Sequence, residues 1–186
     1  MRCSFGYILR SRIFASGTTV ALPGTCAYAL EPELCLVLGA PLAGSVDRET
    51  ARAAVAAVAP ACEINQARVP PDAADAVRLA DGTGNWGIVV GPPNPAAVAG
   101  DGLSATAVRV FNGQTEVGRS PMQPDMDDPF ASLASLSRLL AVHGRSLHPG
   151  DHVITGSFTR VVVTGAAFWR AEFDNVGQVT VDVVPE

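Results

Sequence analysis

The sequence contains no lysine, and its thirteen basic residues are all arginine. This absence excludes chemistry in which a lysine amine forms a Schiff base or acts as the general base. Arginine cannot replace lysine in either role, because its guanidinium stays protonated. Charged residues make up only 17% of the 186 residues, and the formal net charge is -5. A chain with this acidic balance has no general electrostatic attraction for nucleic acid or an anionic membrane, and we expect neither as a partner.

Long hydrophobic runs and paired cysteine motifs are also missing. No apolar run reaches the ~18 residues that span a bilayer, and the N-terminus lacks the apolar core of a signal peptide. We therefore expect a soluble, cytoplasmic protein. The four cysteines include no CxxC pair. Cys35 and Cys62 lie in apolar runs, and we interpret them as small buried hydrophobic residues in a reducing compartment.

The remaining composition favours β-structure with many turns. Apolar residues make up 48% of the chain, with 18 glycines and 14 prolines. This balance is typical of a folded, β-rich domain rather than a disordered chain. The length predicts one domain, residues 1–186, that can bury a full core without a metal or disulfide to stabilise it.

Hydrophobic periodicity and turn signals predict the following elements. Alanine-rich residues 45–59 predict a helix that is capped by Ser45 or Asp47 and stopped by Pro60. A second helix is predicted over residues 130–142, with an Asp127-Asp128-Pro129 start and Gly144 beyond its end. A short helix follows Pro70-Pro71-Asp72 and ends near Leu79. Strands are predicted at residues 18–22, 30–38, 61–65, 88–90, 103–110, 114–118, 152–154, 167–173 and 178–184, with a hairpin turn at Asn112-Gly113.

Two glutamates lie at one end of an apolar strand. Glu31 and Glu33 are two residues apart, so in an extended backbone they project from one face, where like charges repel unless a cation lies between them. Pro32 lacks an amide donor, which fits the start or edge of a strand. The alternative is a pair of solvated glutamates, but Glu63 follows in a similar apolar strand. Three carboxylates suit Mg²⁺ or Mn²⁺, whereas zinc would require histidine or cysteine at comparable spacing.

Two other parts of the sequence contain residue types that can form a binding site. The glycine-rich loop at residues 80–87 lacks the GxxxxGK[ST] spacing of a nucleotide loop, and we expect it to let backbone approach a small ligand closely. The three histidines, His143, His148 and His152, would have to converge from a helix end, a loop and a strand to bind a metal. We interpret them as structural.

The order of motifs resembles the fumarylacetoacetate hydrolase superfamily, and within it the 2-keto-4-pentenoate hydratase and 4-oxalocrotonate decarboxylase branch. The resemblance implies a mixed α/β, β-rich fold, a β-roll like the fumarylacetoacetate hydrolase C-terminal domain with a few packing helices. It covers almost the whole chain in collinear order. The motifs that carry it are Glu31-Pro32-Glu33, Pro60-Ala61-Cys62-Glu63-Ile64 with Arg68, Leu79-Ala80-Asp81, Phe111-Asn112-Gly113, Pro149-Gly150-Asp151, Ile154-Thr155-Gly156-Ser157-Phe158-Thr159 and Asn175-Val176-Gly177-Gln178-Val179.

The resemblance implies that Glu31, Glu33 and Glu63 hold Mg²⁺ or Mn²⁺, which in turn chelates a small 2-oxo acid. The metal would act as a Lewis acid that stabilises an enolate. Glu33 and Asp81 are the implied catalytic residues, with Asp81 moving a proton or orienting water. For Asp81 the alternative is a loop aspartate that caps its own turn.

Four further residues are implied to bind the substrate. Gly156 and Ser157 would meet the substrate carboxylate, and Thr159 could assist them. Arg68 could hold a substrate carboxylate or pair with Glu63, since a guanidinium does both through bidentate bonds.

The implied activity is that of a metal-dependent lyase, a hydratase that adds water to a 2-hydroxydienoic or 2-oxo acid such as 2-hydroxypenta-2,4-dienoate. Decarboxylation of a 2-oxo acid and carbon–carbon bond hydrolysis are alternatives within the superfamily. Hydratases of this branch carry an active-site lysine that this sequence lacks, and this favours a third alternative, a non-catalytic homologue that acts as a structural or partner subunit. The resemblance also implies a homo-oligomer, with a partner enzyme or chain as the alternative.

Overall fold

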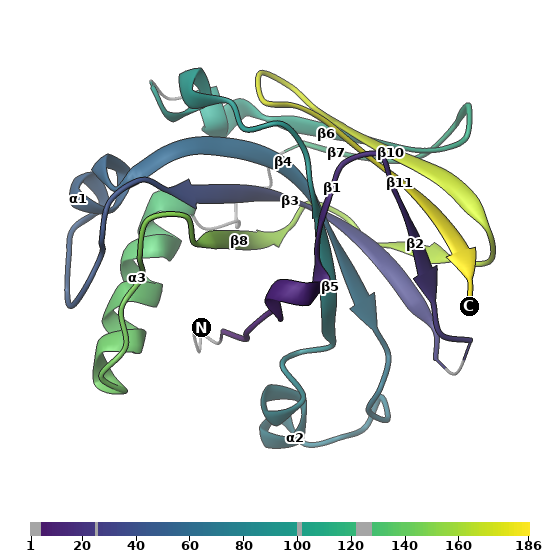
Figure 1. The fold of residues 1–186 in the computed structure, drawn as a ribbon, viewed down its shortest axis with the longest axis horizontal. Helices are drawn as coiled ribbons and strands as arrows, with labels where there is room; N and C mark the ends of the chain where they lie inside the picture. The colour runs from purple at the N-terminus through teal and green to yellow at the C-terminus, as the bar shows by residue number, and fades with distance from the viewer. Residues whose placement is uncertain (1–4, 25, 100–101, 122–127) are drawn as a thin grey trace.

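Two β-sheets pack against each other and form most of the molecule. The computed structural model describes residues 5–24, 26–99, 102–121 and 128–186 (Figure 1). The first sheet has the strand order β1-β5-β4-β3-β8, with β9 also paired to β3, and the second has the order β2-β11-β10-β6-β7. The first sheet contains β1 (Ile13–Ala15), β3 (Tyr28–Leu38), β4 (Val55–Gln66), β5 (Asn85–Val90), β8 (His152–Ser157) and β9 (Val161–Val163). The second contains β2 (Thr18–Leu22), β6 (Ala107–Asn112), β7 (Thr115–Pro121), β10 (Ala167–Phe173) and β11 (Gly177–Pro185).

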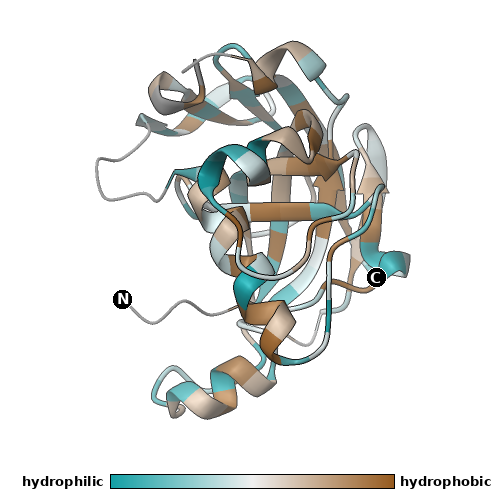
Figure 2. Cartoon of the chain, turned by 90° about the vertical axis from the view of Figure 1, so that its left-hand side faces the viewer, coloured by the Kyte–Doolittle hydropathy of each residue, from teal (hydrophilic) through white to brown (hydrophobic). Residues whose placement is uncertain are grey.

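Strand alternation separates the core of the molecule from its candidate site. In β3 and β4 the even-numbered side chains, such as Leu34, Leu36 and Ile64, are buried in one cluster with Trp169 and Val181 of the second sheet. The odd-numbered side chains point to the opposite face, because successive residues of a strand alternate. Figure 2 shows hydrophobic residues along the central strands. The glutamates of β3 and β4 therefore lie on the face that the second sheet does not cover.

Short helices lie at the ends of this sandwich. The α-helices are α1 (Arg48–Ala53), α2 (Asp75–Ala80) and α3 (Pro129–Val142), and the 3₁₀ turns are η1 (Arg10–Arg12), η2 (Pro95–Val98) and η3 (Gly102–Ala105). The Asp128 carboxylate accepts hydrogen bonds from the amides of Phe130 and Ala131 and so caps α3. None of the helices in the described part of the chain is long and apolar enough to span a membrane.

The long helix predicted over residues 45–59 is wrong. Asp47 does cap a helix, by accepting from the Thr50 amide, but α1 ends at Ala53. Residues 55–59 belong instead to β4, which pairs with β3 on one side and β5 on the other. Helix propensity is a weak preference even for alanine, and pairing with β3, together with the bridge between Val58 and Asn94, overrides it.

Pro32 and Pro60 both lie within long central strands, so the predicted placement of Pro32 at a strand start or edge is wrong. Each proline sits where a neighbouring strand is interrupted. β9 pairs with β3 as far as Leu30 and β8 pairs from Glu33 onward, so no strand needs the missing Pro32 donor. The Pro60 carbonyl accepts from Gly91, just beyond the end of β5. In antiparallel strands the donor and acceptor of one residue face the same side, so neither proline breaks a ladder bond.

Most other predicted elements are confirmed. β2 and β10 have the predicted bounds, α3 begins one residue earlier than predicted, and Asn112-Gly113 turns the hairpin between β6 and β7. The strand predicted over residues 103–110 begins only at Ala107, because Gly102–Ala105 forms a 3₁₀ turn. Asp127 and Cys3 lie outside the described residues. Overall the β-rich mixed α/β class is confirmed.

Candidate metal centre

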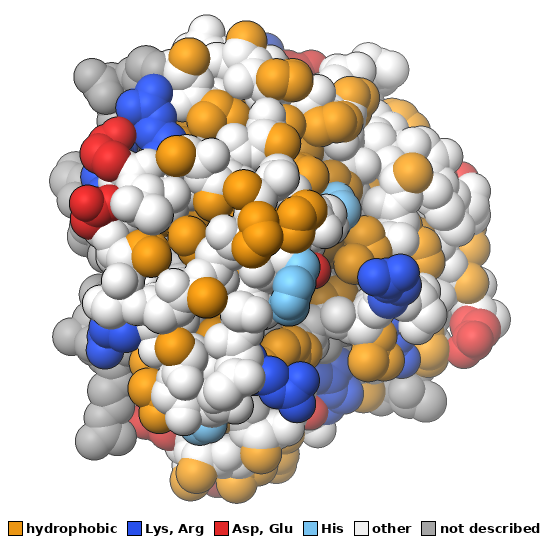
Figure 3. Space-filling view, turned by 60° about the vertical axis from the view of Figure 1, so that its left-hand side comes forward, with side chains coloured by type: hydrophobic (Ala, Val, Ile, Leu, Met, Phe, Trp, Pro, Cys, Tyr) orange, Lys and Arg blue, Asp and Glu red, His pale blue; other side chains and the backbone are white. Residues whose placement is uncertain are grey.

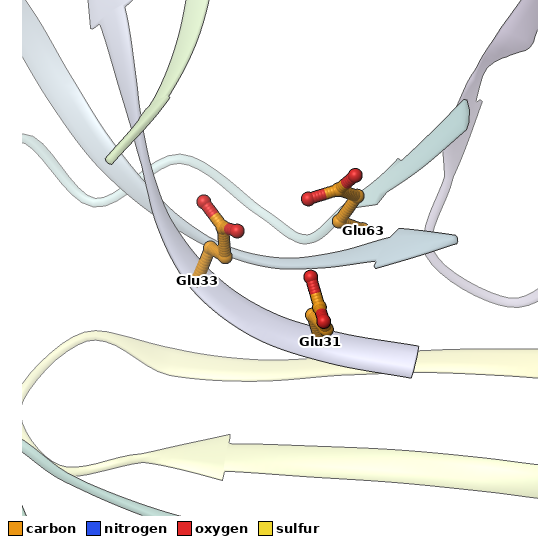
Figure 4. Close-up of side chains that lie close together, drawn as sticks. All are labelled: Glu31, Glu33 and Glu63. Atoms are coloured by element: carbon orange, nitrogen blue, oxygen red, sulfur yellow. The ribbon is translucent and has the colours of Figure 1, made fainter. Parts of the chain in front are cut away.

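Glu31, Glu33 and Glu63 converge on one face of the first sheet. Glu31 is the register partner of Glu63 across β3 and β4, and Glu33 follows two residues later on the same face. Carboxylate oxygens of the three residues lie within 4.8 Å of one another. Figure 4 shows the three side chains pointing toward a common point above the strands. Residue exposure is 3% for Glu33 and 4% for Glu63.

Burial and mutual repulsion make two of these carboxyl groups hard to ionise. Burial raises the pKa of Glu33 well above its usual range, and the nearby Glu63 charge raises it further. Burial, followed by the charge of Glu31, raises the pKa of Glu63 to about 7. A site built this way favours a cation or a proton between its carboxylates.

Gly156 holds the Glu33 carboxylate from the neighbouring strand. Its amide donates a 2.8 Å hydrogen bond to Glu33 Oε2. Gly156 has φ +115°, a conformation that L side chains rarely adopt, so glycine is needed at this point. The turn predicted at residues 155–159 thus lies next to the glutamates. β8 continues through Ser157, farther than predicted.

Ser157 and Thr159, which the sequence assigned to substrate binding, bond to each other. The Ser157 hydroxyl donates to the Thr159 carbonyl at 2.6 Å, and the Ser157 side chain is exposed. Ser157 is also the register partner of Glu33. Ser157 therefore lies beside Glu33, and Thr159 is the residue that accepts the hydrogen bond of its hydroxyl.

Arg160 is a site residue that the sequence reasoning missed. Its guanidinium forms an ion pair with Glu31 and donates two hydrogen bonds of 3.2 Å to Asn65 Oδ1. Asn65 in turn donates to Glu63 Oε1 at 3.3 Å. Two sequence signals could have found them: Asn65 lies two residues beyond Glu63 on the same strand face, and Arg160 directly follows the predicted substrate turn.

Arg68 pairs with Asp81, not with Glu63. The Arg68 side chain donates to Asp81 Oδ1 at 2.8 Å and to Oδ2 at 3.1 Å. It also donates to the backbone carbonyls of Asp81 and Asn85, which ties it to the glycine-rich loop. The Asp81 side chain is only 16% exposed. Arg68 and Asp81, which the sequence assigned to substrate binding and catalysis, thus bind each other in one bidentate ion pair.

The donor set of the three glutamates fits a hard divalent cation. Mg²⁺ and Mn²⁺ prefer oxygen ligands, and three carboxylates from two adjacent strands leave the far side of such an ion open for water or substrate. Among the described residues, this is the one cluster of three or more potential metal ligands, and the three histidines form no such group.

Comparison with known proteins gives one clear sequence relative. The chain is 32% identical over 165 residues to a 4-oxalocrotonate decarboxylase from a Pseudomonas species, over 84% of this chain and 61% of that protein. It thus spans less than two thirds of the length of that relative. No family model matches the sequence.

Solved structures with the same fold include 4-oxalocrotonate decarboxylase from Pseudomonas putida G7, in complex with magnesium and adipate. Its TM-score is 0.83 at 20% identity, covering 96% of this chain and 69% of that one. Maleylpyruvate hydrolase from Sphingobium sp. SYK-6 has a TM-score of 0.76 at 20% identity, covering 96% and 64% of the two chains. Fumarylpyruvate hydrolase from Pseudomonas aeruginosa, in complex with Mn²⁺ and pyruvate, has a TM-score of 0.69 at 21% identity, covering 96% and 75%.

These solved structures, a decarboxylase and two hydrolases, share the β-rich architecture described above. The chain belongs to the fumarylacetoacetate hydrolase superfamily, and its sequence relative confirms the branch that includes the 4-oxalocrotonate decarboxylases.

Proposed function

We propose that this chain binds Mg²⁺ or Mn²⁺ through Glu31, Glu33 and Glu63 and acts as a lyase on a small 2-oxo or 2-hydroxydienoic acid. The observation that carries the proposal is the convergence of three carboxylates on one sheet face. The relatives solved with magnesium, calcium or manganese support it. A divalent cation bound there would act as a Lewis acid toward the negative charge that develops on the keto oxygen of such a substrate.

The residues around the glutamates have distinct roles in this proposal. Gly156 keeps the Glu33 carboxylate in place through its amide. The Ser157 hydroxyl would donate to the substrate carboxylate once it leaves the Thr159 carbonyl, to which it bonds in the free protein. Arg160 adds a guanidinium that pairs with Glu31, and the exposed part of this guanidinium can also pair with the substrate carboxylate.

Addition of water to a 2-hydroxydienoic acid such as 2-hydroxypenta-2,4-dienoate is the specific reaction we place first. Among the described residues, Arg160 is the one cation that forms an ion pair with any of the three glutamates, through Glu31, which suits a substrate with a single carboxylate. In this reaction the enol loses its proton and carbon 5 takes one, which gives a conjugated 2-oxo-3-alkenoate. A water oxygen then bonds to carbon 4 and gives up a proton, the electron pair of the carbon 3–carbon 4 double bond moves to the 2-oxo end, and carbon 3 takes a proton. Asp81 is the candidate to orient the water, and it would have to loosen its bonds to Arg68 to do so.

Decarboxylation of a 2-oxo dicarboxylate is the second candidate. The 32% identical relative is a decarboxylase, and the Arg68–Asp81 ion pair leaves Asp81 less available to orient water. In this reaction the carbon–carbon bond to the departing carboxylate breaks, its electron pair moves to the enolate, and solvent supplies the final proton. A non-catalytic partner subunit remains the competing class, because the chain has no lysine.

Calorimetric titration tests the proposed centre. We expect Mg²⁺ to bind, and then oxalate, a mimic of the enolate, to bind only when Mg²⁺ is present. Glu33→Gln should abolish both steps, whereas Glu116→Gln, which alters an exposed glutamate paired with Arg119 on β7, should change neither. Absence of Mg²⁺ binding at millimolar concentration would rule out the metal-dependent function.

Product analysis then separates the candidate reactions. Loss of dienoate absorbance without gas release identifies hydration, and carbon dioxide release from a 2-oxo dicarboxylate identifies decarboxylation. Metal and oxalate binding without turnover of either substrate would favour the non-catalytic homologue.

A further inference from the structure

The Asn65 side chain joins three separate segments of the chain at the edge of the candidate metal centre. Its amide nitrogen donates to Glu63 Oε1 at 3.3 Å and to the Thr83 carbonyl at 3.2 Å. Its amide oxygen accepts two 3.2 Å hydrogen bonds from the Arg160 guanidinium. A carboxamide has two N–H donors and one oxygen with two lone pairs, so all the hydrogen-bonding positions of the Asn65 side chain are occupied.

These partners fix the orientation of the Asn65 amide. The Glu63 carboxylate and the Thr83 carbonyl accept hydrogen bonds, whereas a guanidinium can only donate them. If the amide were turned over, its nitrogen would face the Arg160 guanidinium and its oxygen would face two other oxygens. Asn65 therefore has one favourable orientation, in which it holds Glu63 and Arg160 at fixed positions relative to each other.

Arg160 and Asn65 complete a ring on the outer side of the glutamates. Arg160 forms an ion pair with Glu31, and its side chain is 48% exposed against 14% for Glu31. A similar contrast is visible in Figure 3, where arginine side chains near the middle of the face cover more surface than the acidic side chains beside them. Glu31 is in turn the register partner of Glu63, to which Asn65 donates. Without Asn65, the guanidinium would be free to move over the carboxylates and compete with a cation for them.

The glycine-rich turn at residues 82–84 packs directly against the Asn65 amide. A Cβ on Gly84 would lie 3.0 Å from Asn65 Oδ1 and 3.1 Å from its Nδ2, which is tighter than an ordinary van der Waals contact. The sequence predicts that this loop lets backbone approach a small ligand closely. In the structure, the Gly84 backbone makes such a close approach to the side chain of Asn65.

The same turn holds a strained backbone conformation. Gly82, Thr83 and Gly84 have φ of +77°, +59° and +84° in succession. Threonine is branched at Cβ and rarely adopts positive φ, so the conformation of Thr83 costs free energy that the surrounding contacts must offset. The hydrogen bond from Asn65 to the Thr83 carbonyl is one of these contacts. Strain of this kind is found at active sites and switch segments.

We propose that Asn65 is a positioning residue of the metal centre and couples the turn at residues 82–84 to Glu63 and Arg160. The inference rests on the proposed function, because its effect is on the Mg²⁺ ligands of that site. The Asn65 amide keeps the Glu63 carboxylate beside the other two and keeps Arg160 on the outer side of Glu31. Coupling between two sites is reciprocal. Bound Mg²⁺ therefore makes the turn more rigid, and a turn that displaces Asn65 weakens Mg²⁺ binding.

A pair of glycine variants tests the coupling from the side of the turn. Gly84→Ala places a methyl group against Asn65, whereas Gly17→Ala places one at φ +85° with no atom within 4 Å, so the two variants carry similar backbone strain. We expect Mg²⁺ affinity, measured by calorimetry, to fall about tenfold in Gly84→Ala and to stay within about twofold of the wild-type value in Gly17→Ala. Equal Mg²⁺ affinities in the two variants would refute the coupling.

A double-mutant cycle shows whether the effect passes through the Asn65 side chain. The Cβ of Gly84→Ala would also lie 3.1 Å from the Gln66 carbonyl oxygen, so the backbone of β4 is a second route. Asn65→Ala should weaken Mg²⁺ binding about tenfold, and adding Gly84→Ala to it should change the affinity little further. Asn94→Ala, which removes an asparagine with three side-chain hydrogen bonds of its own, is the control and should leave Mg²⁺ affinity unchanged. Additive losses in the double variant would assign the effect to the backbone and refute the role of Asn65.

Hydrogen exchange measures the coupling in the other direction. The amides of Thr83 and Asn85 donate to backbone carbonyls in or next to the turn, so their exchange rates report its rigidity. Mg²⁺ should slow exchange at residues 82–85 several-fold in the wild-type protein and should not do so in Asn65→Ala. The hairpin turn at residues 112–113 is the control and should respond in neither protein. This measurement uses no variant of the turn, so it decides the question even where Gly84→Ala does not fold.

Two kinds of failure are distinguishable. Slowing that persists in Asn65→Ala, or no slowing in the wild-type protein at saturating Mg²⁺, refutes the coupling while leaving the metal centre intact. Failure of the wild-type protein to bind Mg²⁺ at millimolar concentration refutes the proposed function and this inference with it.

Discussion

The Gly156 amide donates a 2.8 Å hydrogen bond to Glu33 Oε2, so two neighbouring strands hold one buried carboxylate between them. The bond joins residues 123 positions apart in the sequence. It requires the positive φ of Gly156, and it gives the most buried of the three glutamates a fixed partner on the metal-facing side of the sheet.

Gly156→Ala should weaken metal binding as well as the fold. A Cβ at this position meets no atom within 4 Å, so the cost is backbone strain at φ +115°, about 1–3 kcal/mol. If the backbone relaxes, the amide turns away from Glu33. We expect a loss of unfolding free energy in urea and a weaker Mg²⁺ affinity by calorimetry. Gly150→Ala, also at positive φ in open space, should lose similar stability with unchanged Mg²⁺ affinity. Equal Mg²⁺ affinities in the two variants would contradict the role given to Gly156.

The stability of the metal-free protein should fall as the pH rises from about 4.5 through 7. The folded-state pKa values of Glu33 and Glu63 are raised, to about 7 for Glu63, so the folded protein holds protons more tightly than the unfolded chain. Stability is then fully present below the unfolded value of about 4.5 and is lost as the pH passes the folded values. Urea unfolding at pH 5 and pH 8 measures the difference in unfolding free energy between the two pH values. In Glu63→Gln this difference should be smaller. A pH dependence unchanged in Glu63→Gln would argue against this origin.

Mg²⁺ binding should release protons at neutral pH, because a metal binds the ionised carboxylates. Affinity should therefore rise between pH 6 and pH 8. Calorimetry in two buffers with different ionisation enthalpies counts the protons released. Equal apparent binding enthalpies in both buffers would show that the glutamates are already ionised in the metal-free protein.

Arg160→Gln should have opposite effects on the two ligands. Removing a cation that contacts Glu31 lessens the repulsion of a divalent ion, so Mg²⁺ should bind several-fold more tightly at low salt. Pyruvate or oxalate should bind more weakly to the Mg²⁺-loaded variant, because one carboxylate partner is lost. Arg109→Gln, which breaks the Arg109–Glu172 pair on the second sheet, is the control and should change neither affinity. A parallel change in both affinities would instead indicate general damage to the site.

The Arg68–Asp81 pair should show strong energetic coupling. Its bidentate geometry and partial burial predict an interaction of about 1–3 kcal/mol between the two side chains. A double-mutant cycle of Arg68→Gln and Asp81→Asn, read by urea unfolding, measures this coupling. If Asp81 also orients water, Asp81→Asn should lower turnover more than Arg68→Gln does, at equal Mg²⁺ affinity. Equal turnover in the two variants would assign Asp81 a purely structural role.

Several features of the site follow from local sequence alone. Glu31 and Glu33 share a face because side chains alternate along a strand, and this holds whichever strands lie beside them. The α3 helix and the Asn112-Gly113 hairpin were likewise predicted from capping residues, apolar spacing and turn chemistry, all of which act within a few residues. The motifs also indicated the superfamily, which the sequence relative confirms.

Tertiary structure decided the rest, because the deciding contacts join distant parts of the chain. Residues 55–59 form strand rather than helix because β3 pairs with them on one side and Asn94 bridges to Val58 on the other, and no local signal reports those neighbours. The same pairing sets Glu31 opposite Glu63 and brings Arg160 to Glu31 across 129 positions of sequence. The sequence by itself determined which residues could bind a cation. The packing of the strands determined that these residues meet and that a guanidinium joins them, because the contacts concerned link segments far apart in the sequence.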